Sequence, residues 1–329
     1  MKKRTILMSV FATVAMWLPI DACVGQNIIL HGDADDEVYN YGDLASYGDE
    51  DEGPIVERKL DLKDFKAVQN NYSATICYTQ SRQYGVKMVG SQKAIDMMDF
   101  TVKDGTLSIN VKKQFKRKNL NILRGIKLYI SSPDLKSISN RGSLTIEGEH
   151  CKLGDLSIDN IGALTLKVGN LECQDLQLEN RGSLRYVNGE VKASGVKISN
   201  LGAITLDLSF DVKETFNLSN RGSSKLDGKV RAKSYAELCQ GASTDNLDIA
   251  SDTLQLDIQG SGKINSSYKG KAATINGGGA SNILMNVDCD KLSIESKGAS
   301  KIKVTGTADD TFIENHGVAK VDVSGLNKF

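Results

Sequence analysis

A short motif returns at a fixed interval through the second half of the chain. Asparagine, a variable residue, glycine and a small residue recur five times between Asn140 and Ser224, and beyond Gly222 the glycine recurs at an interval one residue shorter. A fixed period of roughly 20 residues indicates one supersecondary unit that is stacked many times. The glycines of the repeat are Gly142, Gly162, Gly182, Gly202, Gly222, Gly241, Gly260, Gly279, Gly298 and Gly317.

One repeat, residues 156–175, shows what the unit is. Apolar and polar residues alternate in Leu156–Ile158 and again in Leu164–Val168, on either side of the corner Asn160–Gly162. Strict alternation is typical of strands with one buried face, and the repeat has no helical period. A second turn is predicted at Gly169–Asn170. The sequence therefore predicts an all-β chain, a parallel β-helix of about ten coils of 19–20 residues, stacked about 4.8 Å apart.

The Asn-x-Gly corner has a structural explanation. Asparagine and glycine tolerate positive φ better than other residues, so we expect a sharp turn there. Stacked asparagine side chains can also hydrogen-bond their equivalents in the next coil. We therefore interpret the repeated asparagines as structural rather than as ligands for a bound molecule. They are Asn140, Asn160, Asn180, Asn200 and Asn220.

Composition narrows the possible functions. The chain has 41 basic and 41 acidic side chains, which argues against a general nucleic-acid binder. Beyond Cys23, its cysteines lack the spacing of a disulfide framework or a zinc site, although Cys151 and Cys173 could be neighbours on adjacent coils. We interpret them as small buried apolar residues. No cofactor and no metal site is predicted.

The N-terminus has the pattern of an export signal. Lys2-Lys3-Arg4 precedes a mostly apolar run from Ile6 to Ile20, and residues 1–22 are predicted to be a signal peptide. The sequence before Cys23 resembles a bacterial lipobox, which would place a lipid on that cysteine. Cleavage near Gln26 by the ordinary signal peptidase is the alternative. The apolar run is short for a membrane span, so any membrane contact is expected through the lipid.

Three further segments follow the signal. Residues 23–55 are predicted to be a flexible acidic linker, because residues 27–54 carry nine acids and no lysine or arginine. Residues 56–135 contain several short alternating runs and are predicted to form an irregular β cap and the first coils. Residues 136–329 are predicted to be the repeat stack. A cap is expected because an open strand edge recruits other chains.

Four stretches of the sequence carry a resemblance to a known family: Arg58-Lys59-Leu60 with Phe65, Gly105–Ile109, Lys127–Leu135, and the coils at Gly260 and Gly298. With these stretches the chain resembles the putative auto-transporter adhesins with a head GIN domain, which are common among exported proteins of Bacteroidetes. The resemblance covers roughly residues 57–323 and implies a right-handed, single-stranded parallel β-helix. That hand agrees with the rule for parallel connections. The resemblance implies no catalytic or binding residues.

A search for catalytic groups favours a protein that is not an enzyme. His31, His150 and His316 are far apart in the sequence, and no Ser/His/Asp arrangement can be argued. Some parallel β-helices are polysaccharide lyases or hydrolases, and this stays an alternative. Such enzymes build clefts from long loops and clustered carboxylates, whereas these coils have almost no insertions.

One surface feature suggests a binding role. Arg141, Arg181 and Arg221 occupy the same corner position on every second coil, with Ile161 and Leu201 between them. They could bind an acidic glycan or another anionic envelope component, or they could only avoid like-charge neighbours while their stems pack on the apolar residues. The sequence predicts an exported outer-membrane, cell-surface or periplasmic adhesin. A periplasmic structural protein without an external ligand is a further alternative, and the oligomeric state is left open.

Overall fold

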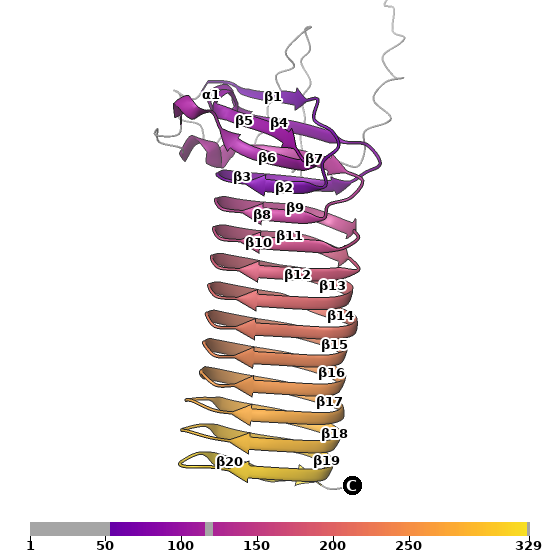
Figure 1. The fold of residues 1–329 in the computed structure, drawn as a ribbon, viewed down its shortest axis with the longest axis vertical. Helices are drawn as coiled ribbons and strands as arrows, with labels where there is room; N and C mark the ends of the chain where they lie inside the picture. Colours follow the sequence, from indigo (N-terminus) through magenta and orange to yellow (C-terminus); the bar gives the residue numbers. More distant parts are fainter. Residues whose placement is uncertain (1–52, 116–120, 328–329) are drawn as a thin grey trace, which may run out of the picture.

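The computed structural model describes residues 53–115 and 121–327. These residues form a tall stack of coils with a cap of strands at the N-terminal end (Figure 1). The stack confirms the predicted all-β parallel β-helix, while its right-handed winding stays a prediction. The predicted signal peptide, Cys23 and nearly all of the acidic linker lie outside the described residues.

Parallel pairing at a spacing of one repeat builds the stack. Each strand pairs with the strand of the next coil, and the asparagines of successive corners lie directly opposite each other. The strands of the first coils are β8 (Ser137–Asn140), β9 (Ser143–Lys152), β10 (Leu156–Asn160), β11 (Ala163–Glu172) and β12 (Asp175–Asn180). Those of the later coils are β13 (Ser183–Asn200), β14 (Ala203–Asn220), β15 (Ser223–Cys239), β16 (Ala242–Ile258), β17 (Ser261–Gly277), β18 (Asn282–Ser296), β19 (Lys301–Asn315) and β20 (Lys320–Asn327).

The predicted turn at Gly169–Asn170 is wrong. Strand β11 runs through both residues without a break, and from β13 onward one strand occupies almost a whole coil. Asn170 pairs with His150 and Glu190 in the coils on either side, and Val168 pairs with Gly148, so the ladder resumes directly after Gly169. The pairing on both sides of Gly169 satisfies most of the backbone there, so no separate turn is needed.

The core consists of columns of inward side chains. Leu144, Leu164, Leu184 and Ile204 lie opposite one another in successive coils and are buried. Alternate residues of each strand point outward, as period-two geometry requires. Of the cysteines in the described residues, Cys151, Cys239 and Cys289 lie in this core, Cys77 is buried as well, and Cys173 is half-buried. This agrees with their prediction as small apolar residues.

The cap closes the N-terminal end by changing strand direction. β2 and β3 stack in parallel on the first coil, and β6 and β7 stack on them. β5 and β4 then pair antiparallel with β6 and β7, and β1 pairs antiparallel with β4. The cap elements are β1 (Ile55–Leu60), β2 (Ala67–Asn70), β3 (Ser73–Gln80), β4 (Gly85–Ser91), α1 (Gln92–Met97), β5 (Met98–Lys103), β6 (Thr106–Val111), η3 (Lys113–Phe115), η4 (Asn121–Gly125) and β7 (Lys127–Ser132).

The corner asparagines form a buried ladder, as the sequence predicts. The side-chain amide of Asn160 donates to Oδ1 of Asn180 at 2.7 Å, and the same contact joins each neighbouring pair from Asn140 to Asn220. Each of these side chains is almost completely buried. The ladder begins in the cap, where Asn70 donates to Asn140 at 2.9 Å.

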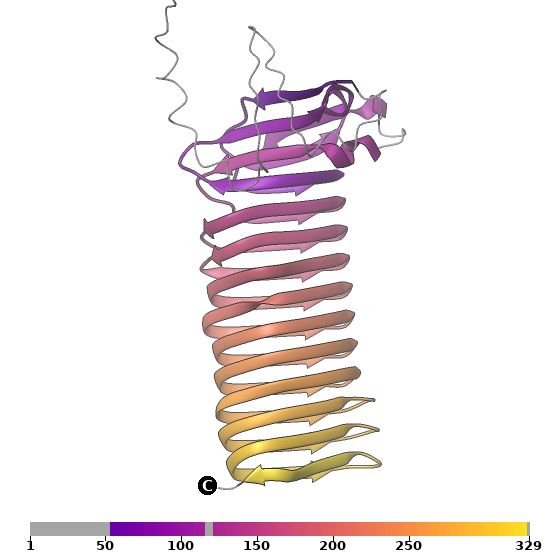
Figure 2. The same cartoon turned by 180° about the vertical axis from the view of Figure 1, so that it is seen from behind.

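The reason predicted for the corner glycines is wrong for most of the stack. Among these glycines, all of which lie in the described residues, positive φ occurs only at Gly279, Gly298 and Gly317, whose loops project from the stack (Figures 1 and 2). At the earlier corners the backbone of the preceding coil is too close for a side chain. A Cβ on Gly182 would lie 2.0 Å from the carbonyl oxygen of Gly162.

Because neighbouring coils approach closely at the corner, we expect a larger side chain to destabilise the protein there but not at an open position. We expect Gly182→Ala to lower the free energy of unfolding by about 2 kcal/mol or more, because the neighbouring coil must move away. Gly154→Ala is the control, since its Cβ would meet nothing within 4 Å. We expect it to change stability by less than about 0.5 kcal/mol. Equal unfolding midpoints in urea for the two variants would contradict the steric explanation.

Candidate functional site

A polar groove lies on the flank of the stack. It crosses four consecutive coils, from β15 to β18, is largely open to solvent, and has a volume of about 470 Å³. Its outward side chains are carboxylates, amides, hydroxyls and one ammonium group. The lining residues are Asp227, Gly228, Lys229, Asn246, Leu247, Asp248, Asn265, Ser266, Ser267 and Asn286.

The register of the stack places these groups in rows. Lys229, Asp248, Ser267 and Asn286 lie directly opposite one another in successive coils. Gly228 forms part of the floor with φ of 132°, a conformation that glycine adopts easily. The groove therefore follows from in-register stacking and a bend in the strand rather than from an inserted loop.

Hydrogen bonds between coils orient part of the groove. The Ser267 hydroxyl donates to Asp248 Oδ1 at 2.8 Å, and the Asn246 amide lies 3.4 Å from both carboxylate oxygens of Asp227. The groove thus presents acceptors and donors side by side at the spacing of the coils. Such groups can bind a ligand rich in hydroxyls, and no aromatic ring is among the described residues that line the groove.

The predicted arginine column exists, and one of its three cations, Arg181, is paired with a carboxylate. Arg141, Arg181 and Arg221 lie two coils apart at one corner, as the register of the preceding asparagines requires. Arg181 contacts Asp159 at 2.7 Å, and this hydrogen bond raises the pKa of its guanidinium. Arg221 donates to Gln240 at 3.0 Å. Ligand binding by the three arginines stays a prediction.

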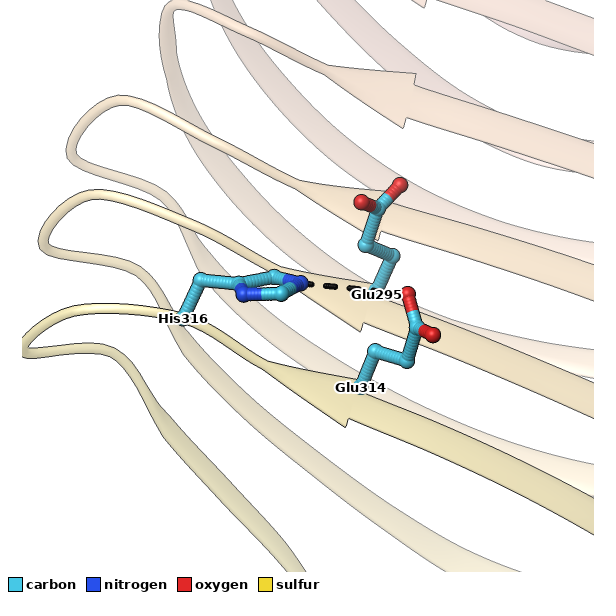
Figure 3. A group of neighbouring side chains, drawn as sticks. All are labelled: Glu295, Glu314 and His316. Atoms are coloured by element: carbon cyan, nitrogen blue, oxygen red, sulfur yellow. Dashed lines mark ion pairs between the residues drawn. The ribbon is translucent and has the colours of Figure 1, made fainter.

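A second cluster lies near the C-terminal end and is shown in Figure 3. One ligand atom each of Glu295, Glu314 and His316 lies within 4.8 Å of the others. His316 Nε2 is 3.8 Å from Glu314, whereas Lys297 lies 2.5 Å from Glu295. The bond to Lys297 lowers the pKa of Glu295. The group offers metal-ligating atoms, but a lysine ammonium already neutralises one of the carboxylates.

Two carboxyl groups lie inside the apolar core. Asp245 stands in a column between Leu226 and Ile264, and Glu237 stands between Leu218 and Leu256. Only 2% of Asp245 and 3% of Glu237 is exposed.

The few polar groups around the pair leave it short of donors. The Tyr235 hydroxyl donates to Glu237 at 2.7 Å, whereas neither oxygen of Asp245 accepts a hydrogen bond of good geometry. The buried Ser243 hydroxyl lies beside Asp245 and opposes the rise of its pKa, and Cys239 is the other titratable group nearby.

A proton on one of the two carboxyl groups removes the shortage of hydrogen-bond donors. Burial raises the pKa of both carboxyl groups, and the charge of Glu237 raises the pKa of Asp245 further. A proton on one carboxyl supplies the donor that the pair otherwise lacks, because a neutral acid both donates and accepts. The two groups can then hydrogen-bond each other inside the core.

Sequence reasoning missed the groove, the Glu295–Glu314–His316 cluster and the buried pair. It also treated the histidines as isolated, although His150 borders a smaller groove with Glu190 and Lys192. A signal was present for two of the sites. Glu295 and Glu314 are one repeat apart in the sequence, and Asp245 is one repeat away from apolar residues on both sides.

A family model matches most of the chain. It is described as a putative auto-transporter adhesin, head GIN domain, and it matches residues 64–208 and 253–328. The chain belongs to this family. Membership confirms the predicted resemblance. No curated protein matches.

Solved structures similar to this head GIN domain protein include two putative adhesins. The one from Bacteroides fragilis is 18% identical, with 82% of this chain and 96% of that chain covered and a TM-score of 0.41. The one from Parabacteroides distasonis is 16% identical, with 82% and 98% covered and a TM-score of 0.43. A putative lipid binding protein from Parabacteroides distasonis is 17% identical, with 81% and 96% covered and a TM-score of 0.37.

The helices among the described residues of this head GIN domain protein are short. Within residues 53–115 and 121–327, none has the length and apolar character to cross a membrane. Helix α1 has six residues.

The buried pair predicts an unusual dependence of stability on pH. Unfolded carboxyl groups titrate near pH 4, whereas the raised pKa values keep protons on the folded pair to higher pH. The folded state therefore binds more protons, and the contribution of the pair to stability falls as pH rises above about 4. We expect Asp245→Asn to flatten this fall and to raise stability at pH 8 by about 1 kcal/mol or more.

Urea unfolding at pH 5 and pH 8 measures the effect. Asp248→Asn, on the outer face, is the matched control and should keep the slope of the unaltered protein. An unchanged slope in Asp245→Asn would show that the pair is not protonated in the folded state.

Proposed function

We propose that this protein is an exported, non-enzymatic envelope protein of adhesin type, and that the flank groove binds a hydroxyl-rich glycan. The observation that carries the proposal is the row of in-register carboxylate, amide and hydroxyl groups across four coils. Family membership supports an adhesin-like role. The groove lies open on a rigid face, which suits an extended polymer better than an enclosed small molecule.

The chemistry of the groove favours a neutral glycan over an acidic one. Asp227 and Asp248 would repel a polyanion, whereas carboxylate and amide oxygens accept hydrogen bonds from sugar hydroxyls. The amides of Asn246, Asn265 and Asn286 add donors. The arginine column remains a second candidate surface, for an anionic ligand, with Arg181 already engaged by Asp159.

The N-terminal sequence supports a location at the cell envelope. A basic segment and an apolar run precede Cys23, which we propose as a possible lipid attachment site, and an acidic segment follows it before the folded region. This order suits a body held away from a membrane by a tether. Either face of the outer membrane is compatible with this order.

Two measurements test the proposal. Protease treatment of intact cells should release peptides from residues 53–327, whereas protection until the outer membrane is broken would contradict a surface adhesin. The purified protein should bind neutral glycans on an array. Asp227→Ala combined with Asp248→Ala should weaken that binding at least tenfold, because it removes two acceptors from the groove.

A matched control separates the groove from general surface charge. Glu214→Ala combined with Asp252→Ala also removes two exposed carboxylates, and both lie outside the groove. This variant should bind as the unaltered protein does. Binding that falls equally in both variants, or no binding to any glycan, would overturn the assignment of the groove.

A further inference from the structure

The Glu295–Glu314–His316 cluster is built from two adjacent coils. Glu295 lies in β18, Glu314 lies in β19, and His316 follows the end of β19. Figure 3 shows the His316 ring reaching toward the two glutamates. The cluster therefore brings an imidazole nitrogen and two carboxyl groups to one corner of the stack, where solvent can reach them.

Strand register and strand period place the three ligand atoms within reach of one ion. Glu295 lies directly opposite Glu314, and His316 is two residues beyond Glu314, near the end of the same strand. Residues two apart in a strand lie on one face. One ligand atom of each residue lies within 4.8 Å of the others. Ligand atoms on one tetrahedral zinc ion are about 3.4 Å apart, so small rotations of exposed side chains would complete the geometry.

The stacked glutamates favour a cation between them. Directly opposed like charges destabilise a pair of strands, and the register holds these two carboxylates side by side. Lys297 is 2.5 Å from Glu295, but within residues 53–115 and 121–327 Glu314 forms an ion pair only with His316. One ammonium group thus faces two carboxylates. A divalent ion would balance both charges.

The preceding coils of the same row lack this combination. Asn276 lies opposite Glu295 on the side away from Glu314, and Asp257 lies opposite Asn276. The Asp257 carboxylate accepts a hydrogen bond of 3.1 Å from Gln259, which occupies the position of the histidine in its own coil. In the described part of this row, two adjacent carboxylates meet an imidazole only at the coils of Glu295 and Glu314.

We propose that Glu295, Glu314 and His316 bind a divalent transition metal ion, and that zinc fits the site best. One imidazole nitrogen with two carboxylate oxygens suits zinc, whereas calcium and magnesium prefer oxygen ligands alone. The ion would replace the Lys297 ammonium at Glu295 and join two adjacent coils. The cluster shares no residue with the flank groove, so metal binding and glycan binding can fail separately.

Titration calorimetry of the full chain with zinc tests the proposal. Glu314→Gln and His316→Ala should each weaken zinc binding by at least about tenfold, because each removes one of three ligands. His150→Ala is the matched control, since it removes another exposed imidazole that lies beside carboxylates. This control should bind zinc as the unaltered protein does. Circular dichroism confirms that each variant is folded.

A variant of Lys297 separates metal binding from a purely structural role of the cluster. Lys297→Met should tighten zinc binding by about threefold, the size expected when an exposed ion pair no longer competes. A large excess of calcium should not displace the zinc. The proposal would be overturned by no zinc binding, by zinc binding insensitive to both Glu314→Gln and His316→Ala, by equal or weaker binding in Lys297→Met, or by displacement with calcium.

Discussion

Hydrogen bonding between coils at the Asn-x-Gly corner is the constraint on which the rest of the structure depends. The amide of Asn160 donates to the carbonyl of Gly162 in its own coil, and to Asn180 Oδ1 and the Ser183 carbonyl in the next. One buried side chain thus shapes its own corner and fixes the position of its neighbour. Buried amides are stable only when their partners are present, so the ladder specifies one register for the whole stack.

The ladder ends where the period of the sequence changes. After Asn220 the corner position passes to Cys239 and then Ile258, and each coil becomes shorter by one residue. Serines take over part of the polar role, as in the contact of 2.7 Å between Ser296 and Ser300. The protonatable pair of Glu237 and Asp245 lies at this transition.

Fixed register also explains the form of the candidate sites. Because the coils keep the same length, each outward residue lies beside the equivalent residue of the next coil. Functional groups therefore lie in rows along the flank. The groups that line the groove, from Asp227 to Asn286, form such rows.

Much of this fold could be predicted because one coil determines the next. The alternation in Leu164–Val168 and the repeat of Asn160 were sufficient to predict the columns of inward side chains and the amide ladder. The role of the corner glycines could not be predicted in the same way. A turn with positive φ and a close contact with the neighbouring coil both favour glycine. At Gly182 only the position of the neighbouring carbonyl distinguishes the two causes.

The sites were harder to predict than the fold. A row such as Lys229, Asp248 and Ser267 repeats in register but varies in residue type, so a search for a constant motif does not find it. Salt bridges have the same difficulty, because Asp159 lies in the coil before Arg181 and far from it in the sequence. Side-chain partners across coils become visible only when the register is known.

The stability of an asparagine variant tests the central role of the ladder most directly. Asn180→Ala removes the bonds that Asn180 donates to Gly182, Asn200 and Ala203, and it removes one of the three acceptors of the Asn160 amide. The account predicts a loss of about 2 kcal/mol or more in the free energy of unfolding, measured in urea. Asn246→Ala on the outer face should cost less than about 0.5 kcal/mol. Equal stability of the two variants would contradict the claim that the buried ladder holds the stack together.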